Sequence, residues 1–402
     1  MRFLRDNARW LSAGGLLVFS SSFGQTYFIA LYAGYFRETF ALSHADWGAI
    51  YAAGTFASAA MMLVVGGLVD HVRIRDAALV VLACFAGVAV LVSQISAVWM
   101  LPILIFGLRF CGQGLMGHIG MVGTARWFAA RRGRALSIVA MGFGLGEALL
   151  PVTFVAITAL IGWRSSWLVA SLLLLAMMPV VTWLLARERQ PSGTADDTQT
   201  AGLGGQHWTR RMAVSHWLFW ALVPGLLAQP VFGTAFFFQQ VHMVEIKGWT
   251  LAAFAAAIPI YTAFNFAGLF AGGIAVDRLG ATSLMPVYLL PMATGLVIIA
   301  STDSFAIGAV ALGFLGVTQG LSAVILGALW PEVYGTRNLG AIRSVTSALM
   351  VFATALGPAL TGYLIDAGVS YNLQLVGMAV YILCVAVLNA VAMARLRISV
   401  AA

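Results

Sequence analysis

Apolar residues dominate this chain in long blocks that are separated by short polar stretches. Windows of about twenty apolar residues, the length that a helix needs to cross about 30 Å of hydrocarbon, recur along the sequence. The first six predicted spans cover residues 11–35, 46–69, 76–95, 97–124, 135–160 and 165–186. The second six cover residues 213–240, 250–276, 282–301, 304–330, 339–366 and 371–394. The pattern predicts an all-α integral membrane protein with twelve transmembrane helices in two six-helix bundles.

One clearly polar stretch separates the two sets of spans. Residues 187–211 contain Pro191, Ser192, Asp196, Asp197 and several glycines, a composition typical of flexible linkers. We therefore expect an N-terminal bundle at 1–186, a cytoplasmic linker at 187–212 and a C-terminal bundle at 213–402.

The composition excludes a soluble globular protein. Apolar residues make up 61% of the chain and charged residues 9%, whereas soluble proteins carry about one charged residue in four. The net charge of +8 comes from arginines in short clusters, not from one basic face, so nucleic-acid binding is not indicated. Cys84, Cys111 and Cys384 lie in apolar stretches without the spacing of a disulfide framework or metal site. We expect no metal and no cofactor.

The distribution of basic residues predicts the orientation. Eighteen arginines fall in loops on the N-terminal side, whereas the opposite loops hold Arg37, Arg164 and Lys247. Basic loops stay in the cytoplasm, so both termini are predicted to be cytoplasmic in a plasma membrane, the inner membrane if the cell is bacterial. The basic N-terminus has no small-residue cleavage site and is read as a first span.

The two sets of spans are related by an internal repeat, which is a known construction of transporters. Three landmarks recur at an offset of 206 or 207 residues: Gly66 and Asp70 as Gly273 and Asp277, Pro151 as Pro358, and Gln113-Gly114-Leu115 as Gln319-Gly320-Leu321.

The first landmark belongs to a loop motif. Gly66-Gly67-Leu68-Val69-Asp70-His71 and Gly273-Ile274-Ala275-Val276-Asp277-Arg278-Leu279-Gly280 follow the second and eighth spans. Both resemble the cytoplasmic loop motif of the major facilitator superfamily, G-x-L-a-D-r-x-G-r, although the first copy has Arg73 at its second glycine. The resemblance implies a twelve-helix fold and a secondary transporter that works by alternating access.

The same resemblance implies a cytoplasmic gate. Its residues would be Gly66, Asp70, Gly273, Asp277 and Arg278, with Arg126 and Arg343 as candidate partners of the aspartates. Glycines let helices approach closely, and an aspartate at a helix end can cap a neighbouring helix or pair with an arginine. The alternative is a loop charge that only sets the topology.

A second resemblance bears on the substrate. The segment Arg126-Trp127-Phe128-Ala129-Ala130-Arg131-Arg132-Gly133-Arg134-Ala135 precedes Gly142, Gly144, Gly146 and Pro151. This region is similar to the fourth and fifth spans of monocarboxylate and oxalate/formate carriers, which implies a small organic anion. Span five lacks the Gly-Pro-x-x-Gly-Gly run of drug-exporting antiporters, which favours uptake.

Arg109 is the most informative single residue. It lies ten residues from Trp99, or about 15 Å deep, near the middle of the membrane, where a charge is by default a functional-site hypothesis. If spans four and five are antiparallel neighbours, Glu147 lies opposite Gln113, one turn from Arg109. An Arg109–Glu147 ion pair is therefore predicted, either for substrate binding and proton coupling or as a structural pair.

Other polar residues at similar depth extend the candidate site. Gln25, Gln229, Asn265 and Gln319 are expected to line a central cavity, or else to form hydrogen bonds between helices. His118 is a candidate proton relay, or else packs against span five.

The leading function is a secondary transporter of a small solute, an organic anion such as a monocarboxylate, with proton-coupled uptake. The alternatives are an efflux antiporter of a drug-like or neutral solute and a non-transporting sensor on the same scaffold. No nucleophile–base spacing, metal cluster or phosphate loop indicates an enzyme or direct use of ATP. The expected partners are the substrate, the lipid bilayer and protons, and the expected state is a monomer.

The arginine asymmetry gives a first testable prediction. Reporter fusions placed after Arg189 and at the C-terminus should both report a cytoplasmic location, because basic loops are retained on that side. An external signal from either fusion would reverse the orientation.

Overall fold

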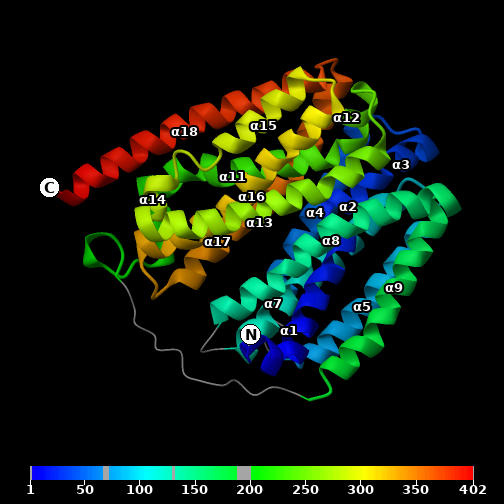
Figure 1. Cartoon of the computed structure of the whole chain (residues 1–402), viewed down its shortest axis with the longest axis horizontal. Coiled ribbons are helices and arrows are strands. Elements are labelled where there is room, and N and C mark those ends of the chain that lie inside the picture. The colour runs from blue at the N-terminus through cyan, green and yellow to red at the C-terminus, as the bar shows by residue number, and fades with distance from the viewer. Residues whose placement is uncertain (1, 67–71, 129–131, 188–200, 402) are drawn as a thin grey trace. The chain divides into compact units, whose positions relative to one another are not determined.

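The computed structural model describes residues 2–66, 72–128, 132–187 and 201–401, and within them the chain is nearly all helical, without a strand. The first half contains α1 (Arg2–Ser20), η1 (Ser21–Gly24), α2 (Thr26–Ile29), η2 (Ala30–Tyr32), α3 (Ala33–Phe40), α4 (His44–Val65), α5 (Ile74–Ser93), α6 (Met100–Leu108), η4 (Arg109–Met116), α7 (Gly117–Trp127), α8 (Arg132–Ile161) and α9 (Trp163–Leu184) (Figure 1). The second half contains η5 (Leu203–Gly205), α10 (Arg210–Ser215), α11 (Trp217–Phe238), α12 (Gln240–Ile246), α13 (Leu251–Leu279), α14 (Ala281–Leu284), α15 (Leu290–Ser301), α16 (Phe305–Tyr334), α17 (Leu339–Asp366) and α18 (Tyr371–Ala401).

The helices match the hydrophobic windows closely. The described part of the chain contains nine helices that are long and apolar enough to cross a membrane, or ten if the bent pair Arg5–Gly24 and Thr26–Phe40 is one span. Helix α4, with 22 residues, occupies the predicted second span. The all-α membrane fold is thereby confirmed, while the count of twelve spans stays a prediction.

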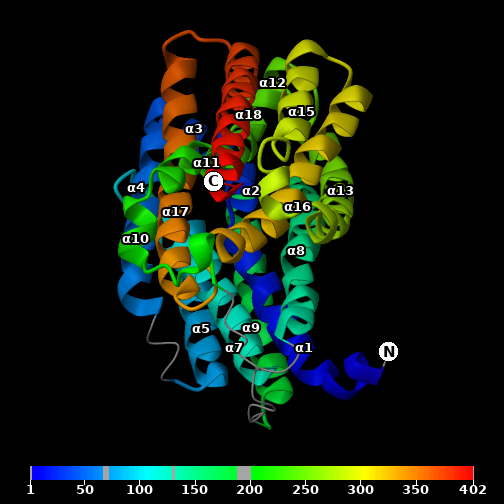
Figure 2. The same cartoon turned by 90° about the vertical axis from the view of Figure 1, so that its left-hand side faces the viewer.

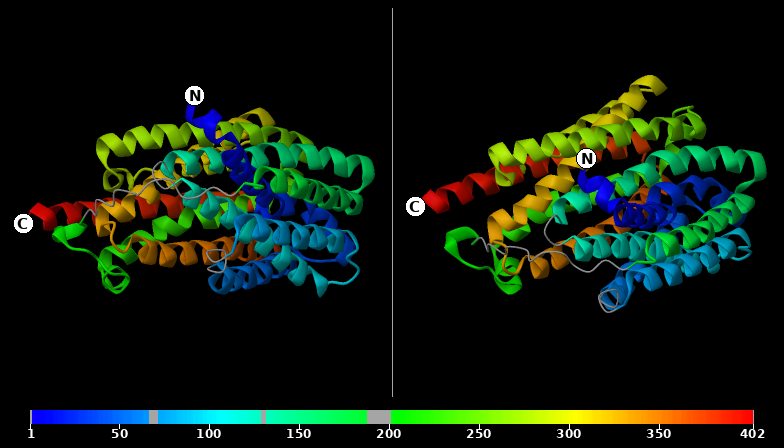
Figure 3. Two further views of the ribbon diagram at one scale, coloured as in Figure 1. Left: turned by 90° about the horizontal axis from the view of Figure 1, so that it is seen from below. Right: turned by 60° about the horizontal axis from the view of Figure 1, so that its bottom comes forward.

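The chain divides into two compact units, Met1–Asp196 and Asp197–Ala402. In the first unit α1 packs on α8, α4 on α6, and α5 on α9; Figure 3 shows α5 and α9 side by side. In the second unit the equivalent pairs are α11 with α17, α13 with α16, and α15 with α18 (Figure 2). The repeat in the sequence therefore corresponds to the same order of helix pairing in each unit.

Glycines set the closest helix crossing of the second unit, between α13 and α16. A Cβ atom on Gly316 would lie 2.2 Å from the carbonyl oxygen of Tyr261, and one on Gly320 would lie 2.1 Å from that of Asn265. Only a residue without a side chain lets two backbones approach so closely. Gly320 belongs to the repeated Gln-Gly-Leu landmark, so this landmark marks a helix contact.

The ninth predicted span, 282–301, is interrupted, and the expectation of one continuous helix there is wrong. Pro286 lies in the turn between α14 and α15, where a proline removes a backbone donor and breaks the helix. The polar backbone of the break is satisfied by other helices: Met292 N donates to Thr318 Oγ1 (2.9 Å), and Asn389 Nδ2 donates to a carbonyl of the turn (3.2 Å). Such pairing is what permits a non-helical segment at membrane depth.

The end of the predicted linker is ordered on the second unit. The Trp208 ring lies 5.2 Å from the Tyr334 ring between centroids, and Asn338 Nδ2 donates to the Trp208 carbonyl (2.9 Å). Flexibility was expected from composition, but Trp208 supplies an apolar anchor that composition does not weigh. Residues 188–200 of the linker lie outside the described residues.

The glycine crossing predicts a difference between two substitutions on α16. Gly320→Ala should destabilise the protein by about 1–3 kcal/mol, because the added methyl group must push α13 away. Gly327→Ala is the matched control, since a Cβ there meets nothing within 4 Å. Thermal unfolding in detergent measures both. Equal melting temperatures for the two variants would contradict the close crossing.

Candidate functional site

The first span is broken near its middle, and the break leaves a carbonyl without its helical partner. The 3₁₀ turn η1 ends at Gly24, Gln25 is extended (φ −82°, ψ 155°), and α2 begins at Thr26, with a bend of 45° between the two parts. Phe28 N donates to the Gln25 carbonyl (3.1 Å) instead of the Gly24 carbonyl, which an unbroken helix would use. The Gly24 oxygen therefore needs another donor.

Arg109 supplies that donor. It begins the π-helical segment η4 in span four, a rare geometry that is frequent at functional sites. Arg109 Nη1 donates to the Gly24 carbonyl (3.4 Å) and to Thr26 Oγ1 (3.2 Å). The guanidinium carbon lies 5.5 Å from the centre of the Tyr51 ring, and Tyr51 OH donates to Thr26 Oγ1 (2.7 Å). Three spans thus meet around one buried guanidinium.

Two glycines allow spans one and four to approach closely. A Cβ atom on Gly112 would lie 2.6 Å from the Gly24 Cα atom, and one on Gly24 would lie 2.1 Å from the Leu108 carbonyl oxygen. The backbones of η1 and η4 are therefore in contact. This contact brings the start of η4 to the break.

The Arg109 charge is deeply buried and has no carboxylate beside it. The residue is 1% exposed, and within the described part of the chain it forms no ion pair. Its Nε and Nη2 atoms are buried without a hydrogen-bond partner. These two donors share one edge of the planar guanidinium, the arrangement that binds the two oxygens of a carboxylate. An unpaired buried charge is costly, so the site favours an anion.

The predicted Arg109–Glu147 ion pair is not formed, and the reason is the position of span one. Glu147 is half-buried on α8 and interacts electrostatically with Tyr27, which follows the break. The preceding Gly146 packs on Ser22, so that α8 approaches the break from its own side. The expectation assumed that spans four and five are neighbours over their whole depth. Instead, both charges approach the break in span one.

The remaining polar candidates lie in different surroundings. Gln25 is in the break itself, and Gln113 is half-buried on η4. In the second unit Gln229 Nε2 donates to Gln319 Oε1, which joins α11 to α16. Asn265 contributes the backbone at the α13–α16 crossing. The side chains of these two glutamines thus form a hydrogen bond with each other.

His118 links span four to the predicted gate. Its Nε2 atom lies 3.1 Å from the carbonyl oxygen of Gly66, which is the C-terminal cap of α4. The contact places His118 against the start of the first loop motif. Among the described residues, no group of three or more His, Cys, Asp or Glu side chains could hold a metal ion.

Within the described part of the chain, the motif glycines Gly66 and Gly273 do not mediate a close helix approach, contrary to the expectation. A Cβ on Gly66 would meet only the end of Met62, at 3.6 Å, and one on Gly273 would meet nothing within 4 Å. The tight crossings lie deeper in the bundles, where two helix backbones touch. Asp70 of the first motif lies outside the described residues.

The charged residues of the second loop motif, Asp277 and Arg278, were expected to belong to the cytoplasmic gate. Asp277 and Arg278 are exposed in the last turn of α13, and Asp277 forms no ion pair with the candidate partner Arg343. Arg126 lies in the last turn of α7, in the first unit.

The second loop motif is organised by Glu332, at the end of α16, a residue that the sequence reasoning missed. Its Oε2 atom accepts from Ala281 N (2.7 Å), and its Oε1 atom accepts from Thr282 Oγ1 (2.6 Å), so it caps the start of α14. The repeat offset of 206 aligns Glu332 with Arg126, which is the signal that could have identified it. The two units therefore carry opposite charges at equivalent positions behind their loop motifs.

Comparison with known proteins identifies the family. The family model for the Major Facilitator Superfamily matches residues 14–271 of this chain. The chain therefore belongs to this superfamily. A bacterial homolog of the human lysosomal transporter Spinster, in an inward-facing and unoccupied conformation, superposes with a TM-score of 0.73 at 15% identity, over 96% of this chain and 97% of that chain. The nucleoside transporter NupG superposes with a TM-score of 0.65 at 11% identity, over 96% and 99% of the two chains. None of the curated proteins matches the sequence.

Membership of the superfamily defines the class of protein. The chain is an integral membrane transporter of the secondary kind, acts on a small-molecule substrate and is not an enzyme. The solved structures, at these identities, show the fold alone.

The polar cluster around the break predicts the effect of changes at Thr26. Thr26→Val should destabilise the protein by about 1–3 kcal/mol, because it removes an acceptor shared by two buried donors, Arg109 Nη1 and Tyr51 OH. Thr26→Ser keeps the hydroxyl group and should stay near the native melting temperature. If the valine variant were as stable as the serine variant, the cluster would not be holding the break.

Proposed function

We propose that this transporter carries a small organic anion, and that Arg109 binds its carboxylate. The observation that carries the proposal is the buried guanidinium edge, Nε and Nη2, which has no partner. A carboxylate would satisfy both donors with two parallel hydrogen bonds and would neutralise the charge. A neutral solute would leave the charge uncompensated in a medium of low dielectric. The charge balance therefore favours an anion such as a monocarboxylate.

The backbone around Arg109 suits a site that opens and closes. Two irregular backbone segments meet at this side chain. Arg109 belongs to the π-helical segment η4, and its guanidinium contacts the break around Gln25. Irregular backbone within membrane helices is typical of transporter binding sites. A substrate that binds one conformation more tightly than the other shifts the population toward it. In our proposal, movement at the break exposes the guanidinium edge, which is sealed in this structure.

Proton coupling is the second part of the proposal, and Glu147 is its carrier. The residue is half-buried and interacts electrostatically with Tyr27, which follows the break. A carboxyl group whose surroundings change during the cycle can take up and release a proton. Binding of an anion at Arg109 would change the charge at the break, which Tyr27, the neighbour of this carboxyl group, directly follows. The two events would then be coupled through span one.

The wider proposal keeps the organisation expected from the sequence. The bundles at 1–186 and 213–402 rock as two bodies joined by the linker at 187–212, with both termini in the cytoplasm of a plasma membrane. Asp70, Arg126, Asp277 and Arg343 serve the cytoplasmic gate. Support comes from the repeated loop motif and from superfamily membership.

Substitution of Arg109 tests the anion site. In proteoliposomes with radiolabelled monocarboxylates, Arg109→Leu should abolish uptake, and Arg109→Lys should reduce it at least about tenfold, because lysine keeps the charge but not the paired donors. Arg210→Lys, at an exposed position, is the matched control and should transport normally. Carboxylate uptake by Arg109→Leu at the native rate would refute the proposed site.

Substitution of Glu147 separates coupling from transport. Glu147→Gln should lose accumulation driven by a pH gradient but keep counterflow exchange, because the amide imitates the protonated carboxyl group. Both activities are measured in the same proteoliposomes. Full pH-driven accumulation by the glutamine variant would remove Glu147 from the coupling mechanism.

A further inference from the structure

Tyr51 of α4 contacts both the Arg109 guanidinium and the hydroxyl group that accepts from it. The guanidinium carbon of Arg109 lies 5.5 Å from the centre of the Tyr51 ring, within the range of a cation–π interaction. Tyr51 OH donates to Thr26 Oγ1, which also accepts from Arg109 Nη1. Tyr51 is 0% exposed and Arg109 is 1% exposed, so water does not weaken these contacts. One side chain therefore holds the charge and its acceptor together.

The lengths of the hydrogen bonds in this cluster show which of them is strongest. Arg109 Nη1 lies 3.2 Å from Thr26 Oγ1 and 3.4 Å from the Gly24 carbonyl oxygen, and both distances exceed the about 2.9–3.0 Å that is usual for an N–H donor. Tyr51 OH lies 2.7 Å from Thr26 Oγ1, which is the usual distance for two oxygens. Long hydrogen bonds restrict the direction of a guanidinium only weakly. The orientation of Arg109 therefore depends on the Tyr51 ring and on the hydroxyl group that Tyr51 holds in place.

Aromatic packing fixes the Tyr51 ring in turn. Trp47, one turn earlier on α4, lies 6.2 Å from Tyr51 between ring centroids, and Phe36 of α3 lies 5.3 Å from Trp47. Phe36 also lies 5.4 Å from Trp163, the first residue of α9. Phe36 and Trp47 are each 1% exposed, and such spacings are the preferred ones for aromatic pairs. A continuous series of rings thus connects Tyr51 with the part of span one that follows the break.

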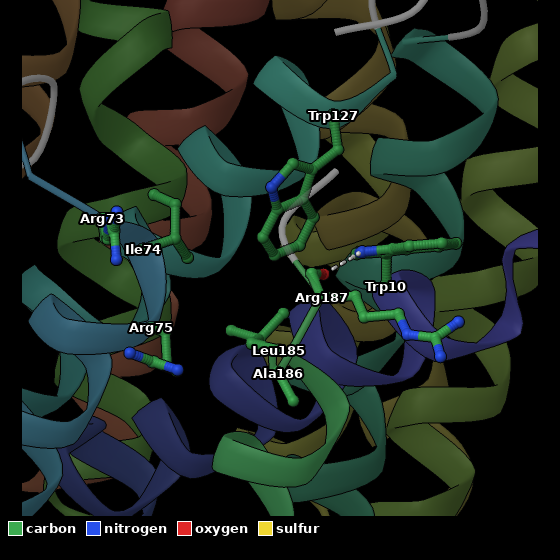
Figure 4. Close-up of a pocket in the computed structure, with 8 residues that line it drawn as sticks. All are labelled: Trp10, Arg73, Ile74, Arg75, Trp127, Leu185, Ala186 and Arg187. Atoms are coloured by element: carbon green, nitrogen blue, oxygen red, sulfur yellow. Dashed lines mark hydrogen bonds between the residues drawn. The ribbon is translucent and has the colours of Figure 1, made fainter. Parts of the chain in front are cut away.

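Arginines at one end of the first unit are held in another way. Figure 4 shows the pocket of about 80 Å³ where α5 begins and α9 ends, in which the Arg187 side chain is directed away from Arg73 and Arg75. Arg75 Nε lies 3.1 Å from Asp76 Oδ1, and the Arg75 side chain is 37% exposed. Water and a carboxylate therefore compensate the Arg75 charge. Arg109 is buried and forms no ion pair within the described residues, so uncharged neighbours must orient it.

We propose that Tyr51 is a positioning residue for the transported anion, because it holds the Arg109 guanidinium with the Nε–Nη2 edge turned toward the carboxylate. This role rests on the carboxylate site proposed for Arg109. Thr26 and Gly24 occupy Nη1, the guanidinium lies over the Tyr51 ring, and Nε and Nη2 stay without partners. A guanidinium that turned freely would lose the two parallel hydrogen bonds in most orientations. An edge that is fixed in advance lowers the entropic cost of binding.

The kinetics of uptake test the positioning role. Proteoliposomes are supplied with radiolabelled acetate, pyruvate and lactate, and KM is measured for each monocarboxylate that the native protein carries. Tyr51→Phe keeps the ring but not the hydroxyl group and should raise KM about threefold to tenfold. Tyr51→Leu removes both and should raise KM at least about 30-fold. The maximal rate should stay within about twofold, because the change acts on binding.

A control variant separates positioning from a structural role. Tyr363→Phe removes a hydroxyl group from a side chain that is 64% exposed, and it should keep the native KM. A side chain that only stabilised the fold would lower the amount of active protein, and therefore the maximal rate, without changing KM. A native KM for Tyr51→Phe would overturn the positioning role.

The anion site and the positioning role fail in different ways. If Arg109→Leu abolishes uptake while Tyr51→Phe keeps the native KM, only the positioning role is wrong. If the native protein carries none of the three monocarboxylates, or if Arg109→Leu carries them at the native rate, the anion site is wrong and the role of Tyr51 falls with it.

Thermal unfolding in detergent checks the contact without a substrate. Thr26→Val and Tyr51→Phe break the same hydrogen bond, so the double variant should lose less in melting temperature than the sum of the two single losses. Additive losses would show that the two side chains act independently, and would overturn the positioning role of Tyr51.

Discussion

The first unit depends on one interaction, the insertion of the Arg109 guanidinium into the break of span one. Within hydrocarbon, an unpaired carbonyl and an unpaired guanidinium are each costly. The Gly24 carbonyl is left open because Phe28 N turns to Gln25, and Arg109 fills the gap from span four. Each defect therefore stabilises the other. Removing either one would leave the other without a partner in the membrane.

The interaction satisfies only one side of the guanidinium. Nη1 serves the break, while Nε and Nη2 stay without partners in a buried place. A protein that needed only a helix anchor could use a neutral donor at lower cost. In our proposal, the retained charge and its open edge serve an anion that binds and dissociates during transport. This links the architecture of the bundle to the transport that its superfamily performs.

The two units share a helix order but not a chemistry. The repeat equivalent of Arg109 is Leu315, which is buried, and the second unit joins its helices through glycine crossings and the Gln229–Gln319 hydrogen bond. Its own broken span is satisfied by Thr318, a neutral hydroxyl group. Among the described residues, charged groups near the middle of the apolar windows are thus confined to the first unit. We infer that the charged groups of the transport cycle belong to the first unit, whereas the second unit contributes helices that are joined by uncharged contacts.

The sequence alone determined the helical membrane fold, most span limits and the repeat, because membrane thickness sets the length of each apolar run. It also singled out Arg109, since a charge in an apolar window is visible without coordinates. Only the tertiary structure decided what Arg109 touches, because hydropathy does not encode which helix lies between two others. For the same reason, the sequence did not predict that Glu332 caps α14, or that Thr318 and Asn389 form hydrogen bonds with the backbone at the Pro286 break. Backbone groups find such partners across a fold, and a partner that lies 26 to 104 residues away, as in these contacts, leaves no local pattern.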